Sequence, residues 1–407
     1  MTFTVSEEFK MPEGFLAAGE HVGLKRKRKD LALIVSENPA EFAVALTTNV
    51  VKAAPIMWNQ KVDASGKKLK AIVINSGNAN SCTGATGVEH TWRMAKKTAA
   101  CLNADPGEIL IASTGVIGVP LPIEKVESGI EYLTPFLTDH VSGGVNAATA
   151  IMTTDSFIKH CSVQFRIDGK PVTISAMAKG SGMIHPNMAT MLSFILTDLS
   201  ISKSLLQKAL IASVQKTYNM ISVDGDTSTN DMVAIMANGA SGVAEVQENS
   251  PEWKLFIDAL EAINVYLAKC IARDGEGATK LLTVTVKGSK NIEDAQKLSK
   301  SVVSSNLVKT AMFGEDANWG RIVAALGYGG VWFDQDKVSV ELASDGGKIA
   351  LLNSGEPCPF SESHASEVMK KKNIEVNIDL HDGLSMATAW GCDLSYDYVR
   401  INGAYRT

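Results

Sequence analysis

The stretch from Lys179 to Leu192, KGSGMIHPNMATML, constrains this chain more than any other. It holds two glycines and a proline, and it runs directly into ATMLSFILTDL, which has the composition of a buried strand. The local pattern alone favours an ordinary turn before a strand. It also fits a chain that is cut between Ala189 and Thr190, because the cut would leave a hydroxyl nucleophile and a free α-amine base on Thr190.

The bulk composition excludes several classes of protein. The 407 residues are 45% hydrophobic and 20% charged, which is enough for a large core and for two or three domains. The net charge of −5 leaves no broad basic field, so nucleic acid is not expected as a partner. The short basic run Lys25 to Lys29, KRKRK, predicts a solvated loop.

Targeting, membrane and metal signals are missing from the sequence. The first residues, MTFTVSEEFKMPEGF, lack the apolar segment of a signal peptide, and no stretch has the length and apolarity of a membrane span. We therefore expect a soluble, cytoplasmic protein. The scattered cysteines form no CxxC pair and no metal spacing with histidine, so they are expected to be reduced packing residues. They are Cys82, Cys101, Cys161, Cys270, Cys358 and Cys392.

Alternating apolar runs and helical patterns predict an α/β fold. Residues 31–36 and 43–47 read as two strands of a hairpin joined by ENPAEF, and 70–75 reads as a further strand. The glycine-rich segment 76–87 then precedes a helix at 88–102, but it matches no nucleotide-binding motif. Shorter strands and helices follow from about residue 291, and YDYVRI near the C-terminus predicts a final strand.

Polar residues at the ends of these elements are candidates for a site. Thr114 and Gly115 end the buried strand ILIAS, where a glycine N–H and a threonine hydroxyl could form an oxyanion hole, although the local pattern alone favours a plain strand-end turn. Lys179 ends another strand, and Glu276 lies between two glycines. The acidic segment VDGDTSTND, residues 223–231, lacks the last glutamate of a calcium loop, so no metal is expected.

Seven motifs, in this order, resemble those of glutamate N-acetyltransferase, the ornithine acetyltransferase family of arginine biosynthesis. They run essentially from end to end, which makes the set far more specific than any one member. The motifs are NSGNANSCTG at 75–84, STGVIG at 113–118, MTTDS at 152–156, KGSGMIHPNMATML at 179–192, RDGEGATK at 273–280, GEDANWGR at 314–321 and INGAYRT at 401–407.

The resemblance implies a mechanism and a set of site residues. The precursor would cleave itself between Ala189 and Thr190, and Thr190 would carry the acetyl group from N-acetylornithine to glutamate. Thr114 and Gly115 would form the oxyanion hole. The implied substrate-contacting residues are Thr153 (or its neighbour Thr154), Lys179, Thr190, Glu276, Asn402 and Thr407.

The resemblance also implies an architecture. Residues 1–285 would form a layered αββα-type sandwich with a site of the N-terminal-nucleophile kind, and residues 286–407 a smaller C-terminal α/β domain. The cleaved chains would assemble as α2β2, with small-molecule substrates, no bound cofactor, and acetyl-CoA as an additional co-substrate in some members.

Several alternatives remain open at this point. An N-terminal-nucleophile aminopeptidase or amidase of related fold would transfer the acyl group to water rather than to glutamate, and an uncut binding protein would transfer nothing. The base for self-cleavage is not identified, and His185 is one candidate. A carboxylate such as Glu276 suits a substrate amine and Lys179 suits a substrate carboxylate, but the sequence does not assign the substrate ends.

Overall fold

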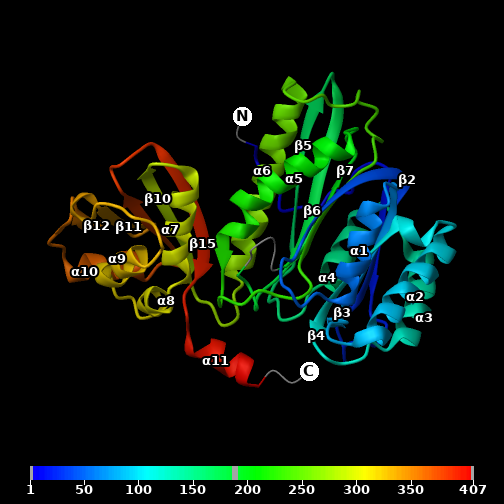
Figure 1. The fold of residues 1–407 in the computed structure, drawn as a ribbon, viewed down its shortest axis with the longest axis horizontal. Helices are drawn as coiled ribbons and strands as arrows, with labels where there is room; N and C mark the ends of the chain where they lie inside the picture. The colour runs from blue at the N-terminus through cyan, green and yellow to red at the C-terminus, as the bar shows by residue number, and fades with distance from the viewer. Residues whose placement is uncertain (1–2, 186–190, 405–407) are drawn as a thin grey trace.

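The computed structural model describes residues 3–185 and 191–404, which form two β-sheets with helices packed on them (Figure 1). The first sheet has eight strands in the order β4-β3-β2-β9-β7-β6-β5, with β1 paired to β2. Its strands are β1 (Phe15–Glu20), β2 (Leu31–Leu46), β3 (Leu69–Asn78), β4 (Ile109–Val116), β5 (Lys159–Ile167), β6 (Lys170–Lys179), β7 (Leu192–Thr197) and β9 (Met232–Ala237).

The long strand β2 is shared by two layers of this sheet. Its first half, residues 31–35, lies between β1 and β3, whereas residues 41–46 pair with β9. The register with β3 shifts between Val35 and Ala40, at the segment that the sequence predicts to be a hairpin turn. The hairpin prediction is therefore wrong. The polar residues ENP, with Pro39 among them, are tolerated because they occupy an irregular point of the ladder.

Alternation of side chains along these strands builds an αββα sandwich, as predicted. Phe194 and Leu196 of β7, with Ile34 of β2 and Ile72 of β3, belong to a core cluster between the two layers. Their sequence neighbours point outward. Ile195 packs in the cluster that includes Leu210 of a covering helix, and Val73 packs in a third cluster on the opposite face.

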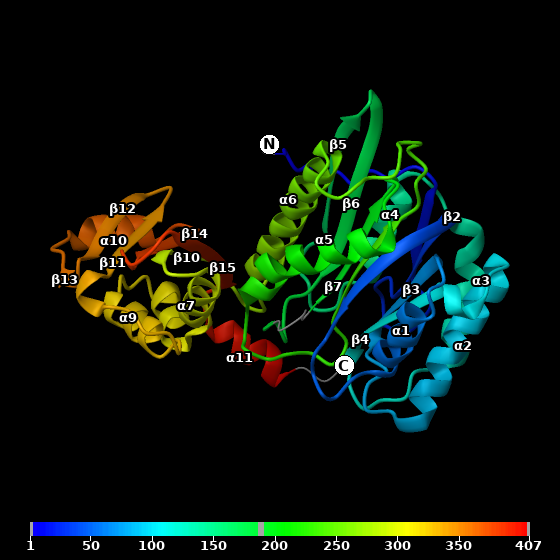
Figure 2. The ribbon, with the colours of Figure 1, turned by 45° about the horizontal axis from the view of Figure 1, so that its top comes forward.

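Helices cover both outer faces of the sandwich and close its middle. In Figure 2, α5 and α6 lie along β5–β7, while α2 and α3 lie at the far side, beyond β3. The helices of this part are α1 (Ala54–Ala64), α2 (Gly84–Leu102), α3 (Ile123–Leu133), α4 (Val141–Ala150), α5 (Lys203–Lys216) and α6 (Pro251–Arg273). Residues of α1 and α4 contribute to the core between the layers.

The second sheet has the order β13-β12-β11-β14-β10-β15-β8. Its strands are β8 (Ile221–Ser222), β10 (Leu281–Ser289), β11 (Ser339–Ser344), β12 (Gly347–Asn353), β13 (Glu356–Pro357), β14 (Asn373–Asp379) and β15 (Ser385–Cys392). The helices of this part are α7 (Ile292–Ser304), α8 (Asn306–Phe313), α9 (Trp319–Gly327), α10 (Glu362–Met369) and α11 (Tyr396–Gly403).

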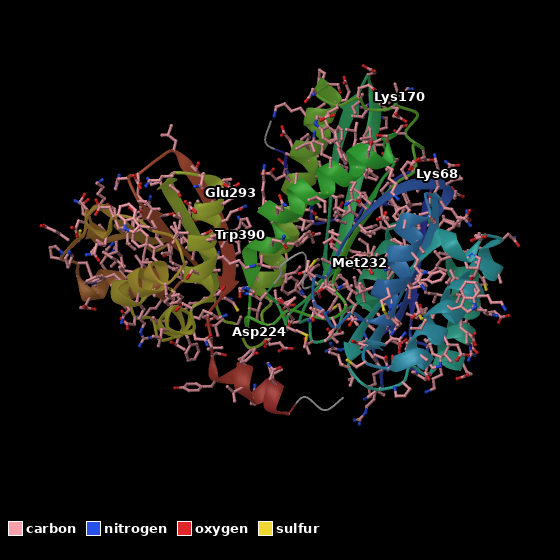
Figure 3. The ribbon with its side chains drawn as sticks, viewed as in Figure 1. Lys68, Lys170, Asp224, Met232, Glu293 and Trp390 are labelled. Atoms are coloured by element: carbon pink, nitrogen blue, oxygen red, sulfur yellow. The ribbon has the colours of Figure 1, made fainter. Side chains whose placement is uncertain are left out.

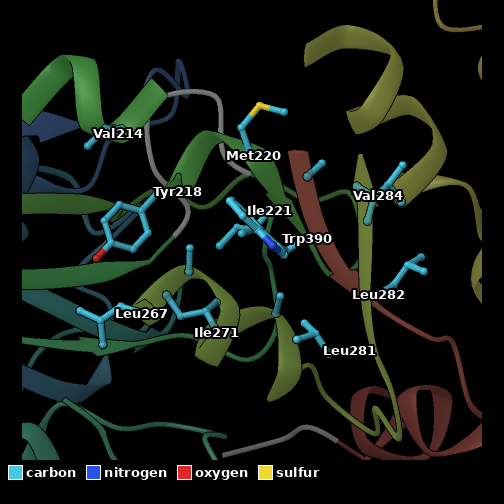
Figure 4. Close-up of a cluster of buried hydrophobic side chains, with 14 of the residues drawn as sticks. Val214, Tyr218, Met220, Ile221, Leu267, Ile271, Leu281, Leu282, Val284 and Trp390 are labelled. Carbon is cyan, nitrogen blue, oxygen red and sulfur yellow. The ribbon is translucent and has the colours of Figure 1, made fainter. Parts of the chain in front are cut away.

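The two parts share one hydrophobic core at their junction. Strand β8 precedes α6 in the chain, yet it pairs in parallel with β15 of the second sheet, with Ile221 opposite Trp390. Figure 4 shows Tyr218 and Ile271 of the first part on one side of Trp390, and Leu282 of β10 on the other. Position 285, the predicted domain boundary, lies inside β10, so the division into 1–285 and 286–407 stays a prediction.

The final strand predicted at YDYVRI is wrong, because these residues form helix α11. The Ser395 hydroxyl caps the helix by accepting a hydrogen bond from the N–H of Asp397. Asp397 in the first turn and Arg400 in the last turn complement the helix dipole. These local signals outweigh the short alternation of apolar and polar residues.

The packing between the layers predicts a large effect for Phe194→Ala. Phe194 is fully buried, and its removal leaves a cavity between the two layers of the first sheet that cannot close, so we expect a loss of about 3–5 kcal/mol in the free energy of unfolding. Denaturant titration measures it. The matched variant Phe136→Ala removes a ring that is 53% exposed and should change stability by about 0.5 kcal/mol or less. Equal effects would contradict the layered core.

Candidate active site

Six of the residues predicted for the site line one cavity of about 170 Å³. They arrive from five separate segments: the end of β4, the loop after α4, the end of β6, the loop after α6, and α11. The six residues are Thr114, Gly115, Thr153, Lys179, Glu276 and Asn402. Thr154, the alternative to Thr153, also lines the cavity. The tertiary structure therefore gathers residues up to about 290 positions apart in the sequence.

Three predicted residues, Ala189, Thr190 and Thr407, lie outside the described residues. Described residues on both sides of the proposed cut lie at the cavity: Met183 and Met191 both line it. The Met191 carbonyl accepts a hydrogen bond of 2.9 Å from the N–H of Met232. The chain that follows residue 190 is thus held at the wall of the cavity before it enters β7.

The predicted oxyanion-hole segment is fixed by close backbone packing. Gly115 has a φ of +136°, and a Cβ at this position would lie 2.3 Å from the carbonyl carbon of Gly77 on β3. Only glycine allows this approach of the two strands. The side-chain amide of Asn230 donates to the carbonyls of Ser113 (2.9 Å) and Ala79 (2.6 Å), so both strand ends are tied to the segment before β9. Preorganisation of this kind is what an oxyanion hole requires.

A buried ionic network supports the wall of the cavity that the Thr153 loop and the end of β6 form. The Lys159 ammonium lies 2.6 Å from Oδ1 of Asp155 and forms a second ion pair with Asp274, and all three side chains are almost fully buried. Asp155 also accepts hydrogen bonds of 2.8 Å from the N–H groups of Thr153 and Gly180. One carboxylate therefore positions two segments that line the cavity, the Thr153 loop and the residue after Lys179.

Burial opposes the ionisation of Asp155, but Lys159, Lys179 and the hydrogen bond from Gly180 outweigh it and hold the pKa of Asp155 well below its usual range. Burial lowers the pKa of Lys179, while the charges of Asp155, Asp231 and Glu276 oppose that shift. Lys179 has no ion pair within 4.0 Å to any acid in the described part of the chain. Its ammonium is therefore available to an anionic substrate group.

Glu276 is placed by a glycine and by the C-terminal helix. A Cβ on Gly182 would lie 2.3 Å from Oε2 of Glu276, so this carboxylate packs directly on the bare backbone. The side-chain amide of Asn402 donates to Oε2 of Glu276 at 2.8 Å, and the Ser395 hydroxyl donates to the Gly277 carbonyl at 2.5 Å. Helix α11 therefore docks on the Glu276 loop and forms one side of the cavity.

The acidic segment 223–231 is a support for the chain that leads to the proposed cut. Asp224 accepts hydrogen bonds from the N–H groups of Met183 (2.6 Å) and Ile184 (2.8 Å), and the Ile184 carbonyl accepts from Val223 at 2.7 Å. Figure 3 shows Asp224 close to α11 at the junction of the two parts. Among the described residues, no group of three His, Cys, Asp or Glu side chains is arranged to hold a metal ion.

Sequence reasoning missed Ser228, Asn230 and Asp231, which also line the cavity. Their position in the sequence was the available signal. This polar run directly precedes the apolar strand β9, and Lys179 and Thr114 likewise lie at an end of a strand. His185, the candidate base, contacts Ser222 at 3.0 Å rather than lining the cavity, and burial, aided by the charge of Lys300, lowers its pKa to about 4.

The basic run 25–29 is a loop in which Arg26, Lys27 and Arg28 are exposed, as predicted, but Lys25 is partly buried and corrects that expectation at one residue. The Lys25 ammonium donates to the carbonyls of Met152 (2.6 Å) and Lys29 (2.8 Å), just before the Thr153 loop. Burial lowers the pKa of Lys25 to about 8 against the opposing charge of Asp30.

The part of the chain that the structure describes contains no helix long and apolar enough to cross a membrane.

A cavity that offers both an ammonium and a carboxylate, beside the start of β7, is typical of an enzyme for small charged substrates. The chain belongs to the ArgJ family, whose model matches residues 16–407. It is 54% identical over 400 residues to the arginine biosynthesis bifunctional protein ArgJ of Caldanaerobacter subterraneus subsp. tengcongensis, covering 98% of each chain. It is 50% identical to that of Symbiobacterium thermophilum, covering 97% of this chain and 98% of the relative.

A solved structure of this family supports the same assignment. The crystal structure of the arginine biosynthesis bifunctional protein ArgJ from Bacillus halodurans is 46% identical, with a TM-score of 0.51, and the match covers 53% of this chain and 100% of that chain. The predicted family is confirmed, and the enzyme is a glutamate N-acetyltransferase (ornithine acetyltransferase) of arginine biosynthesis. The aminopeptidase or amidase alternative is not favoured.

The close packing at Gly115 predicts a severe effect for Gly115→Ala. The added methyl group meets the backbone of Gly77, which cannot move without opening the β3–β4 ladder, so we expect acetyl transfer to fall about a hundredfold or more. The control is Gly118→Ala, a position with positive φ (+80°) but nothing within 4 Å of the new methyl group. It should cost only about 1–2 kcal/mol of stability and keep activity. Equal activities of the two variants would contradict a role for this approach.

The buried network predicts a pH-dependent effect of Asp155→Asn. At pH 7 the change leaves Lys159 with only one of its two buried ion pairs and removes the largest opposing charge from Lys179, so we expect the free energy of unfolding to fall by about 3–5 kcal/mol. Because the folded pKa of Asp155 is depressed, its stabilising contribution is present above the unfolded pKa of about 4 and disappears as the pH falls below it.

The test compares denaturant unfolding of Asp155→Asn and wild type from pH 7 to pH 3. The difference between them should shrink only below about pH 4. Asp139→Asn changes an exposed aspartate and should stay within about 0.5 kcal/mol of wild type throughout. A difference for Asp155→Asn that stays constant over this range would rule out the ionised form as the stabilising one.

Proposed function

We propose that the enzyme transfers the acetyl group of N-acetyl-L-ornithine to L-glutamate through an acetyl ester on Thr190. The observation that carries this proposal is the single cavity lined by Thr114, Gly115, Thr153, Lys179, Glu276 and Asn402. The wall of the same cavity includes Met191, the residue after Thr190. The family match, from residue 16 to residue 407, supports the same reaction.

In the first half-reaction, the Thr190 oxygen attacks the acetyl carbonyl of the donor and the amide C–N bond breaks. The hydroxyl proton passes through the α-amine of Thr190 to the nitrogen of the departing ornithine. The unactivated amide develops an oxyanion, which the segment of Thr114 and Gly115 would stabilise. In the second half-reaction, the glutamate amine attacks the ester, the C–O bond breaks, and the proton returns to Thr190.

The charges at the cavity suit two substrates that share an amino-acid head. A substrate carboxylate is matched by the Lys179 ammonium, which is free of ion pairs with the described acids, and a substrate amine by the Glu276 carboxylate. Asn402 holds Glu276 by a hydrogen bond of 2.8 Å, so the acid is already oriented in the free enzyme. Side chains that are already oriented lose less conformational entropy when the substrate binds.

We propose that the Ala189–Thr190 bond is cut by the Thr190 hydroxyl in an N-to-O acyl shift followed by hydrolysis. Two observations support this. The flanks of the cut are held, by Asp224 on one side and by Met232 on the other. The solved relative's chain aligns over its whole length to 53% of this chain, and residues 190–407, which are 218 of 407 residues, make up 54%.

Three finer assignments complete the proposal. Acetyl-CoA serves as a second acetyl donor for glutamate, which the word "bifunctional" in the names of the relatives supports. The two cleaved chains assemble as α2β2, and the enzyme works in the cytoplasm without a bound cofactor. The substrates are small molecules throughout, as the size of the cavity allows.

Intact-mass measurement tests the proposal directly. The purified protein should consist of two fragments split between Ala189 and Thr190, and incubation with N-acetylornithine should add one acetyl group to the C-terminal fragment. Glutamate, but not buffer alone, should remove that group rapidly, because the acceptor is an amine rather than water. Loss of the group at the same rate in buffer would show a hydrolase.

Thr190→Ala should remain one full-length chain and should show no acetyl transfer, because it has neither the hydroxyl nor the cut. Thr310→Ala, on α8 in the second part, removes a half-buried threonine hydroxyl that bonds only Leu307 and Arg321 in the described part of the chain, and it should split and turn over like wild type. An active or cleaved Thr190→Ala protein would contradict the nucleophile assignment.

A further inference from the structure

The loop between β1 and β2 holds the longest basic run of the chain. Residues 25–29 are five consecutive lysines and arginines, and no other stretch of the sequence has as many in a row. The fully buried carboxylate of Asp30 folds the loop by accepting hydrogen bonds from the N–H groups of Val22 (2.7 Å), Leu24 (2.7 Å) and Lys25 (2.8 Å). Hydrogen bonds to a carboxylate are strong, so the basic side chains are anchored on a fixed backbone.

The five basic side chains divide into two groups. Lys25 and Lys29 donate to backbone carbonyls of the protein itself, whereas Arg26, Lys27 and Arg28 are exposed. In the part of the chain that the structure describes, the side chains of Arg26 and Lys27 form no hydrogen bond and no ion pair. Adjacent cations without a partner repel each other, and an anion bound between them would relieve that repulsion.

The loop touches the wall of the active-site cavity at two points. The Arg28 guanidinium donates to the Thr153 carbonyl at 3.3 Å, and Thr153 lines the cavity. A Cβ on Gly77 would lie 3.0 Å from Cγ of Lys25, and the backbone of Gly77 is the surface on which Gly115 packs. The basic run therefore lies next to the segment of the proposed oxyanion hole and next to the Thr153 loop.

The cavity is too small for one of the proposed acetyl donors. Its volume is about 170 Å³, whereas sites that enclose a molecule of drug size have about 300–1,000 Å³. Acetyl-CoA is larger than such molecules, since a pantetheine arm separates its thioester from an adenine nucleotide. Only the acetyl end can therefore enter the cavity, and the nucleotide with its phosphate groups must lie on the surface beside it.

The charges around the cavity favour one direction for those phosphate groups. On the side of α11 there are acids: Asp224 binds the N–H of Met183 at the cavity wall and lies beside α11 (Figure 3), and Asp226 of the same segment is exposed. These acids repel phosphate. On the side of the Thr153 loop, residues 26–28 contribute three exposed positive charges, which attract it.

We propose that Arg26, Lys27 and Arg28 bind the phosphate groups of acetyl-CoA, while its acetyl end enters the cavity past the Thr153 loop. This inference rests on the proposed use of acetyl-CoA as a second donor. Guanidinium groups bind phosphate oxygens in pairs, and a lysine ammonium adds a further positive charge. N-acetylornithine carries no phosphate, so the ornithine route does not need this surface.

The test removes two of these charges and compares the two donors. In Arg26→Gln/Lys27→Gln the hydrogen bond between Arg28 and Thr153 stays in place, so the cavity wall is unchanged. We expect the KM for acetyl-CoA to rise about tenfold or more, because charge-assisted hydrogen bonds to phosphate are lost. The kcat/KM for N-acetylornithine with glutamate should stay within about twofold of wild type. The melting temperature should not change, since both side chains are exposed.

A matched control removes the same charge elsewhere. Lys370→Gln/Lys371→Gln changes two adjacent, exposed cations of the second part, and it should leave the KM for both donors unchanged. Each double variant changes the net charge from −5 to −7, because two positive charges are lost. The control therefore separates local binding from a general loss of attraction for anions.

Two further readouts identify the phosphate groups as the part that binds. S-acetylpantetheine presents the same thioester without any phosphate, so wild type and Arg26→Gln/Lys27→Gln should use it equally well. Added salt should raise the KM of the wild type for acetyl-CoA more than that of the variant, because salt screens exposed charges.

Several outcomes would overturn the inference. Equal KM values for acetyl-CoA in wild type and Arg26→Gln/Lys27→Gln, or a rise in the Lys370→Gln/Lys371→Gln control, would show that the phosphates bind elsewhere. A defect of the same size with S-acetylpantetheine or N-acetylornithine would give the loop a structural role. A wild type that uses N-acetylornithine but neither binds CoA in calorimetry nor uses acetyl-CoA refutes the second donor itself. A wild type that is inactive with both donors refutes the proposed function instead.

Discussion

The ion pairs of Lys159 are the interaction on which the rest of the site depends. A lysine that is fully buried must be paired, and here one ammonium holds Asp155 from the loop after α4 and Asp274 from the end of α6. Asp155 in turn holds Thr153 and Gly180, and Asp274 holds Ser156 by its N–H at 3.0 Å. Three loops from separate parts of the chain are thereby fixed relative to one another beneath the cavity.

Above this network, the cavity is completed by the junction of the two parts. The pairing of β8 with β15 and the packing around Trp390 bring the second sheet against α6. The chain that leaves β15 then forms α11, whose Asn402 contacts Glu276. The second part therefore contributes one wall directly, through a helix that lies almost at the end of the chain.

Much of the fold was readable from the sequence because most elements carry strong local patterns. The strand predicted at 70–75 lies within β3, and the helix predicted at 88–102 ends where α2 ends. The hairpin at ENPAEF and the strand at YDYVRI were not, because a bulge in one long strand and a helix cap depend on contacts that a short window does not contain. The burial of Lys25 in its otherwise exposed run was missed for the same reason, since the carbonyl of Met152 that accepts its hydrogen bond lies far along the chain.

Two signals made part of the site predictable from the sequence. A polar residue ends a strand beside a glycine at Thr114 and at Lys179, and the seven motifs contain the other predicted residues. Asp231 and Asn230 were missed because their segment resembles a calcium loop, and that comparison drew attention to metal chemistry. Their importance comes from burial and from hydrogen bonds to β3 and β4, which only the tertiary structure supplies. Local pattern could not distinguish them from the exposed acid Asp226.

The strand order of the first sheet has a consequence for the two products of the proposed cut. Strands β2 and β3, before the cut, lie on one side of β9 and β7, which come after it, and β6 and β5, again from before it, lie on the other. The C-terminal fragment is thus enclosed edge to edge by the N-terminal one. Breaking a single peptide bond leaves two polypeptides that are interleaved within one sheet. Separating them would require breaking both ladders at once, so the cut changes the covalent chain but not the folding unit. Neither fragment contains all the strands of the first sheet.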